Sequence, residues 1–265
     1  MKNIIKTVCL FAVAGSLSAM AQTEMADKFD SVGGGNSLGL AGLEPAVYFG
    51  LDLNDGNTEN LGINLGITGK GAINEGSEVL FGIEGNYKED TLVRGGDSQT
   101  TTQTIDADAQ YNYLFNDPWY AYANVKGFHD SIAEIDYRVN VGPGLGYYFI
   151  KDAIAELAVE AGPGYQFEDA GGESLSDPTW RAAQRYSRQI NDKTRVFQDL
   201  EYLPILDDWG DYTLNGQIGL ETELANGYGL RVALKGLNDS TPATVDGIEL
   251  EDTDLNLQVG LLKSL

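Results

Sequence analysis

The feature that most limits how this chain can fold is a two-residue alternation of apolar and polar side chains, which recurs from Glu44 to the C-terminal region. The clearest example runs from Glu134 to Phe149, where odd-numbered positions are mostly apolar and even-numbered positions are mostly charged, polar or glycine. A period of two places successive side chains on opposite faces of a strand, so each segment has one apolar and one polar face. Twelve segments follow this pattern, although 119–128, 180–190 and 195–205 follow it less cleanly.

Two properties of these segments favour a membrane barrel over a soluble sandwich. Their polar faces carry charges of both signs, as expected for a narrow lumen crossed by ion pairs, and aromatic residues such as Phe115, Trp119 and Phe149 lie near their ends. Aromatic residues at both ends of the strands anchor outer-membrane barrels at the lipid interfaces. A sheet that spans lipid must close so that every backbone group is paired. We therefore predict an all-β fold, a closed antiparallel transmembrane β-barrel of about twelve strands, with about ten as the alternative.

The connections between the segments fit such a barrel. If the first strand starts in the periplasm, every second link is short, as at 116–118 and 226–227. Several of the alternate links are longer and acidic, as at 168–177 and 239–251, although the link 206–210 is short. Short periplasmic turns and longer outer loops are the usual asymmetry of outer-membrane barrels.

The first residues have the three parts of a secretory signal. Lys2 and Lys6 form a positive start, residues 8–17 are apolar, and Ala19-Met20-Ala21 matches a cleavage site with small residues. The apolar run is too short to span a bilayer, which disfavours a membrane anchor. We predict a signal peptide over 1–21, a flexible segment over 22–43 and an outer-membrane β-barrel over 44–265. The expected location is the outer membrane of a Gram-negative-type bacterium, after cleavage near Ala21.

Composition excludes several classes of function. The single cysteine, Cys9, lies in the predicted signal, so the mature chain would have no thiol for a disulfide, a nucleophile or a metal ligand. The single histidine, His129, rules out a zinc site built on several histidines. With 17 basic and 40 acidic residues, the chain is not expected to bind nucleic acid, because phosphate binding needs clustered cations. We expect no cofactor and no resident metal.

Two Gly-Pro-Gly segments, 142–144 and 162–164, resemble phosphate-binding loops only superficially. A phosphate loop leads into the N-terminus of a helix, whereas both segments lie inside predicted strands. Glycine in a strand marks a bend or a bulge, and proline cannot donate to the hydrogen-bond ladder. We interpret both segments as curvature devices and expect Pro143 and Pro163 at bulges or near strand ends.

Candidate catalytic and calcium-binding residues are few. The tripeptide His129-Asp130-Ser131 contains three residue types used in catalysis, but adjacent residues rarely converge as base, orienting group and nucleophile. We interpret it as part of a polar outer loop. The acidic pairs Glu89-Asp90 and Asp207-Asp208 offer oxygen ligands that suit calcium, but neither has the spacing of an EF-hand. The chain is therefore predicted not to be an enzyme.

One stretch of the sequence resembles a known family. Tyr137-Arg138 is followed by a Gly-x-Gly-x-Gly-Tyr pattern at 142–147, by Glu-Ala-Gly-Pro-Gly-Tyr at 160–165 and later by Glu-Tyr-Leu-Pro at 201–204. In these motifs, roughly the second half of the mature chain resembles the YdiY-like, salt-induced outer membrane protein family, a domain of unknown function. The resemblance implies an outer-membrane barrel and no established activity. The chain ends in Leu265, where many such barrels end in an aromatic residue.

The candidate functional residues are the charged side chains that alternation directs into the lumen. They are Asp136, Arg138, Glu156, Glu160, Arg181, Arg185, Asp199, Glu201, Glu221, Glu223, Arg231 and Lys235. These residues would form either an ion-paired plug or the selectivity lining of a narrow pore. Barrel size does not decide between the two, because about twelve strands lie between filled small barrels and the open porins of about 16 strands.

The sequence thus favours a non-enzymatic outer-membrane β-barrel with a structural or envelope- and osmotic-stress role, for which a narrow channel is one form. Its alternatives are a small-cation-selective pore, a soluble periplasmic ligand-binding β-barrel and, least favoured, a hydrolase at the outer rim. The expected partners are outer-membrane lipid, the barrel-assembly machinery during biogenesis and, for a pore, small cations.

Overall fold

A computed structural model describes residues 43–54, 59–74, 76–91, 99–242, 244–245, 248–249 and 252–264. The predicted signal peptide and nearly all of the segment 22–43 lie outside these residues. Twelve strands form one closed antiparallel barrel, and a short hairpin of β12 and β13 lies between the last two barrel strands of the sequence. The described residues contain no helix of the length and apolarity that a membrane crossing requires.

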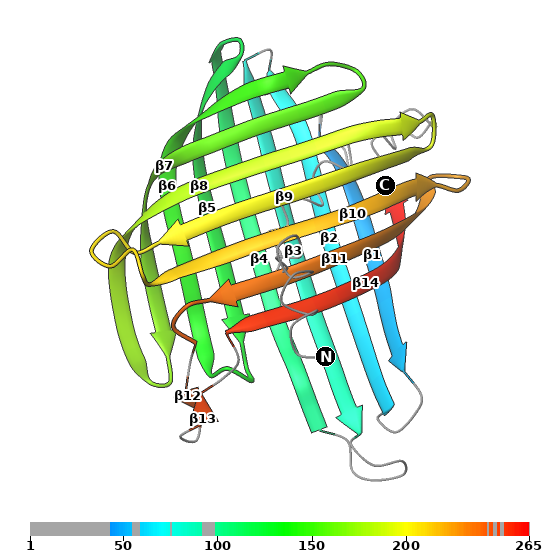
Figure 1. Cartoon of the computed structure of the whole chain (residues 1–265). Helices are drawn as coiled ribbons and strands as arrows, with labels where there is room; N and C mark the ends of the chain where they lie inside the picture. The colour runs from blue at the N-terminus through cyan, green and yellow to red at the C-terminus, as the bar shows by residue number, and fades with distance from the viewer. Residues whose placement is uncertain are drawn as a thin grey trace, which may run out of the picture.

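Each barrel strand pairs with its neighbour in sequence, and the last strand returns to the first (Figure 1). The strands are β1 (Leu43–Asn54), β2 (Glu59–Asn74), β3 (Ser77–Thr91), β4 (Gln99–Asn116), β5 (Trp119–Asp130), β6 (Ile135–Lys151), β7 (Ala155–Ala170), β8 (Glu173–Asn191), β9 (Thr194–Pro204), β10 (Tyr212–Glu223), β11 (Tyr228–Asp239), β12 (Thr244–Val245), β13 (Ile248–Glu249) and β14 (Thr253–Ser264). The predicted fold class and the strand count of twelve are confirmed.

The barrel is apolar on its outside and polar on its inside, the reverse of a soluble protein. Leu65, Phe149 and Leu257 point outward and are 56%, 64% and 60% exposed. Charged residues such as Glu84 and Arg231 point inward and are fully buried. A closed wall with this polarity satisfies its backbone within the sheet and presents apolar side chains to its surroundings, as a lipid-spanning sheet must.

Aromatic residues gather near both ends of the barrel wall. At the end formed by the short turns, the ring of Tyr147 lies 4.8 Å from both Trp119 and Phe149. Toward the opposite end, the ring of Phe167 lies 5.0 Å from that of Tyr165. This arrangement matches the interfacial girdles that the sequence predicts.

Two hairpin turns show how local sequence sets the connections. Asn226 and Gly227, between β10 and β11, have positive φ angles of 57° and 72°, the type I′ geometry that suits a two-residue hairpin. Gly171 and Gly172 do the same between β7 and β8, with φ of 58° and 78°. The predicted long outer loop 168–177 is therefore wrong. The alternation fades there because the hairpin extends beyond the apolar part of the wall, not because the strands end.

Aromatic rings on the inner face lie over glycines of the neighbouring strand. A Cβ atom at Gly146 would lie 2.1 Å from Cζ of Tyr120, and one at Gly144 would lie 2.3 Å from Cζ of Tyr122. The same relation joins Phe197 to Gly219. Glycine is required at these positions because any side chain would occupy the volume of the ring.

The expectation that Pro143 and Pro163 lie at bulges or near strand ends is wrong. Both lie in the middle of their strands, β6 and β7, and the register of Val141 with Tyr165 and of Leu145 with Ala161 places them opposite each other. The irregularities of this strand pair occur elsewhere, near Ile135 and Ile150. Sequence analysis could not detect this alignment, because it depends on the register of the two strands.

Candidate functional site

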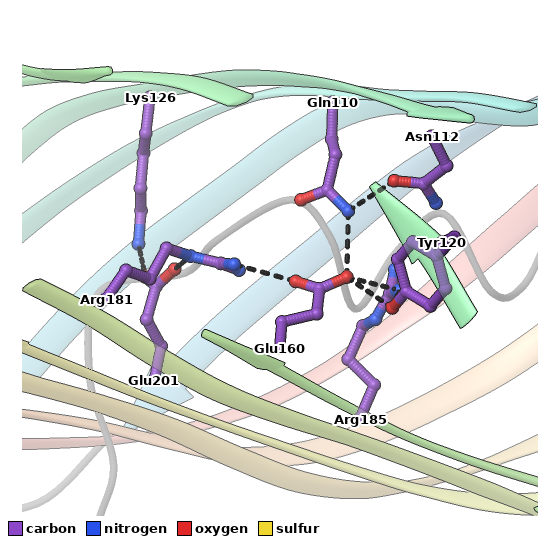
Figure 2. A network of polar contacts seen from close by, with 8 residues as sticks. All are labelled: Gln110, Asn112, Tyr120, Lys126, Glu160, Arg181, Arg185 and Glu201. Carbon is purple, nitrogen blue, oxygen red and sulfur yellow. Dashed lines mark hydrogen bonds and ion pairs between the residues drawn. The ribbon is translucent and has the colours of Figure 1, made fainter. Parts of the chain in front are cut away.

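Glu160 of β7 is the centre of the main polar network inside the barrel (Figure 2). Its carboxylate accepts hydrogen bonds from Arg181 Nη1 at 2.7 Å, Arg185 Nη2 at 2.8 Å, Tyr120 Oη at 2.7 Å and Gln110 Nε2 at 2.9 Å. The donors come from β4, β5 and β8, so one buried carboxylate joins four strands. Hydrogen bonds to a charged acceptor are about twice as strong as neutral ones.

Arg181 extends this network toward the outer end of the barrel. Its Nε atom donates to Glu201 Oε1 at 2.7 Å, and Glu201 also pairs with Lys126. The result is an alternating series of charges, Lys126, Glu201, Arg181, Glu160 and Arg185, all at least mostly buried (Figure 2). Because Lys126 lies on β5 and Glu201 on β9, their contact crosses the lumen between strands that are not neighbours.

A second network lines the wall formed by β9, β10 and β11. Glu221 accepts from Arg195 Nε at 2.7 Å and from Arg231 Nη1 at 2.8 Å. Arg231 also donates to Gln217, which in turn donates to Asp199. The guanidinium of Arg231 lies 4.4 Å from the centre of the Phe197 ring, which adds a cation–π contact to its ion pair.

Three further contacts join strands that are not neighbours in the barrel. Lys235 of β11 donates to Glu84 of β3 at 2.9 Å, and Gln258 of β14 donates to Asn64 of β2 at 3.1 Å. Arg138 of β6 forms a two-pronged pair with Glu168, at 2.6 and 2.9 Å, and reaches Asp239 of β11 at 3.2 Å. The lumen is therefore bridged at several levels rather than open along its length.

The structure places most of the predicted lumen residues in these bridges. The exceptions among them lie near the ends of the barrel. Glu156 is half-buried and lies 3.9 Å from Lys70 Nζ, and Glu223 is half-buried at the last position of β10. Asp136 is exposed beside the first residue of β6, and the structure does not bring it into these bridges. The pairing of β6 with β7 shifts between Ile135 and Tyr137, so the simple alternation fails at this residue.

Several charged residues of the network were not predicted. Lys126 was missed because β5 is aromatic on both faces, so its polar face was not evident. Arg195 and Glu168 lie at the ends of predicted segments, where the assignment of faces is weakest. Glu84 lies on a recognised polar face, but its partner Lys235 is 151 residues away in sequence. If the alternation of faces had been followed along the whole segment from Ser77 to Asp90, Glu84 would have been included among the predicted lumen residues.

The tripeptide 129–131 does not form a catalytic triad. His129 Nε2 lies 3.0 Å from Ser131 Oγ, and His129 Nδ1 lies 2.9 Å from the backbone oxygen of Asp136. Asp130 instead accepts hydrogen bonds from the backbone N–H groups of Ile132 and Ala133 and so stabilises the turn. Its carboxylate is committed to this turn rather than to the imidazole.

The acidic pairs considered for calcium also have local roles. Asp208 Oδ1 accepts a hydrogen bond from the backbone of Gly210 at 2.9 Å. Glu89 accepts from Tyr87, and Asp90 lies 3.6 Å from Lys88. Within the described part of the chain, no three histidine, cysteine or acidic side chains are arranged to hold a metal ion.

Full closure, an apolar exterior and a polar, charged interior together define this chain as a β-barrel of the transmembrane type. The model of the family described as "Protein of unknown function, DUF481" matches residues 47–264, so the chain belongs to that family. The resemblance predicted from the motifs at 137–165 and 201–204 is thereby confirmed. A search of curated proteins found no match.

Solved structures with the same fold are distant in sequence. The NanC porin is 10% identical, with a TM-score of 0.52 over 83% of this chain and 100% of the porin. An outer membrane channel from Pseudomonas putida F1 is 11% identical, with a TM-score of 0.50 over 88% of this chain and 100% of the channel. These similarities establish a shared barrel architecture.

Proposed function

We propose that this protein is a non-enzymatic barrel of the outer membrane of a Gram-negative-type bacterium, and that it acts as a narrow channel for small cations. The observation that carries the proposal is the set of charge contacts that cross the lumen, among them Lys126 to Glu201 and Lys235 to Glu84. These contacts line the lumen with polar groups and obstruct it more than a general diffusion porin would allow. The names of the two structural neighbours, a porin and a channel, are consistent with this role.

The preference for cations rests on the balance of charge inside the barrel. Among the described residues, the buried charged side chains comprise seven acids and six bases. Glu84 and Asp106 lie directly opposite each other on β3 and β4, so two carboxylates face the lumen side by side. Asp106 is only 3% exposed, and its Oδ2 atom has no hydrogen-bond partner. An excess of acid in a low-dielectric pore favours cations over anions.

A second candidate role follows from the same bridges. If the ion pairs never open, the barrel is a sealed structural element of the envelope, with a role in envelope or osmotic stress. A soluble periplasmic barrel is disfavoured by the exposed apolar exterior, which would need to be covered in water. A hydrolase at the outer rim is disfavoured by the engagement of Asp130 in its own turn.

Planar-bilayer recording of the refolded mature protein tests the proposal. We expect discrete steps of small conductance and a reversal potential, under a potassium chloride gradient, that indicates cation selectivity. Lys235→Gln should increase cation conductance, because it opens the bridge to Glu84 and leaves both acids without that cation. Lys263→Gln, at the end of β14, removes a cation that contacts the backbone of Asn226 and serves as the control.

The result that contradicts the channel is equally specific. A correctly folded wild-type barrel without conductance, together with a silent Lys235→Gln variant, would leave the sealed structural role. Anion selectivity would contradict the assignment of the lumen acids.

A further inference from the structure

The wall between β6 and β7 contains a point where neither strand can donate a backbone hydrogen bond. Pro143 and Pro163 lie opposite each other there, and both lack an N–H group. Ladder pairs occur on either side, at Val141 with Tyr165 and at Leu145 with Ala161. We call the facing segments 142–144 and 162–164 the proline seam.

The proline seam is closed by direct backbone contact. A Cβ atom at Gly162 would lie 2.2 Å from the carbonyl oxygen of Pro143, and one at Gly142 would lie 2.5 Å from that of Pro163. The two strands therefore approach so closely that only glycine fits beside each proline. In this geometry the Cα–H groups of both glycines point toward the carbonyl oxygens of the facing prolines.

A shallow hollow lies on the outer face of the seam. Its volume is about 510 Å³, and its lining includes the outward-facing residues Ala123, Val141, Pro143, Pro163 and Tyr165, together with Asn124 and two glycines. A smaller space on the lumen side shares Gly142, Pro163 and Gly164 with the outer hollow.

The position of the hollow identifies its occupant. Pro143 and Pro163 are at the midpoints of β6 and β7, and the exposed neighbours of the hollow are apolar. In a spanning barrel this depth is occupied by the hydrocarbon core, where the available partners are acyl chains. The volume lies within the range of small-molecule sites, of about 300–1,000 Å³.

We propose that the hollow over the proline seam binds one acyl chain of a membrane amphiphile. The hollow is open to the surroundings of the barrel, and a chain lying in it would contact the rings of both prolines and of Tyr165. The hollow lies outside the lumen, so acyl-chain binding does not depend on conduction. A failure of the channel proposal would therefore not contradict this one.

Trp180 provides a natural reporter for this site. It lies directly opposite Pro163 on β8, on the same outward face. In a variant in which Trp119 and Trp209 are replaced by phenylalanine, Trp180 is the only tryptophan of the chain. The detergent-solubilised, full-length mature protein is titrated with a brominated fatty acid, which quenches tryptophan on contact, and then with the same acid without bromine.

We expect saturable quenching of Trp180 that the unbrominated acid reverses. Ala123→Leu fills the hollow and should weaken this quenching several-fold, whereas Ala109→Leu, on the outward face of β4 and away from the hollow, should leave it unchanged. If Ala123→Leu does not refold, Tyr165→Ala serves as the test variant instead. It removes one side of the hollow and should also weaken the quenching. Quenching that rises without saturation, or to the same extent in all variants, would show simple partitioning and overturn the proposal.

Discussion

The carboxylate of Glu160 holds two arginines, a tyrosine and a glutamine in one place, although it is only 1% exposed. Such a group stabilises the barrel only while all of its partners are present, because buried charges without partners are costly. The rings that lie over glycines impose an equally local demand, since they leave no volume for a side chain.

Removing the charge of Glu160 should therefore be strongly destabilising. We expect Glu160→Gln to lower the free energy of unfolding by about 3–5 kcal/mol, because Arg181 and Arg185 would keep their charges in a buried site. Urea unfolding in detergent, followed by tryptophan fluorescence and gel mobility, measures the change. Glu173→Gln, at an exposed position of β8, should unfold like the wild type. Equal stability of both variants would show that the network contributes little.

Gly146 should tolerate no side chain. Gly146→Ala would place a Cβ atom 2.1 Å from the Tyr120 ring, and forcing the two apart should cost about 1–3 kcal/mol. Gly85→Ala is the matched control, because its nearest neighbour would lie 4.0 Å away. Thermal loss of the folded gel band compares the two variants, and an unchanged midpoint for Gly146→Ala would contradict the packing described above.

At the scale of single elements, the turns are organised by local hydrogen bonds. Asp152, between β6 and β7, accepts from the backbone N–H groups of Ile154 and Ala155, each at 2.8 Å. These bonds favour the charged carboxylate and lower its pKa from the ordinary aspartate value. A lowered pKa means that the contribution to stability is complete above the ordinary value and is lost as the pH falls through the lowered value.

Asp152→Ala tests this turn. The variant should be less stable than the wild type at neutral pH. The difference should shrink as the pH falls from the ordinary aspartate pKa through the lowered one, because the carboxylate is protonated first in the unfolded and then in the folded wild type. Unfolding midpoints of both proteins across an acid pH series give the result. A difference that stays constant with pH would mean that the charge of Asp152 does not support the turn.

At the scale of the whole molecule, the barrel depends on the pairing of its first and last strands. β1 and β14 pair from Ala46 with Ser264 to Gly50 with Gly260, a shorter register than that of β1 with β2. Inside the barrel, Tyr48 and Leu262 pack against each other across this closure and are 1% and 2% exposed. The front wall of β8 to β11 and β14 crosses the direction of β1 to β4 behind it, as tilted strands in a closed barrel do (Figure 1).

Leu262→Ala should weaken closure. The loss of this buried side chain should cost about 2–5 kcal/mol and lower the fraction of protein that migrates as a folded, heat-modifiable band after refolding. Leu257→Ala, on the same strand but 60% exposed on the outer face, should assemble normally in lipid vesicles. The closing contact would be unimportant if both variants assembled equally well.

The sequence by itself determined the barrel, its twelve strands and the two faces of most of them, because all three follow from a period of two that is local to each segment. It also placed Glu160, Arg181 and Glu201 on the inner face, because the alternation along a strand decides which face a side chain lies on. Tertiary structure alone decided which charges meet, because Lys126 and Glu201, or Glu84 and Lys235, come together only when the wall closes. It also decided that Pro143 faces Pro163, because register is a property of paired strands and not of either strand alone.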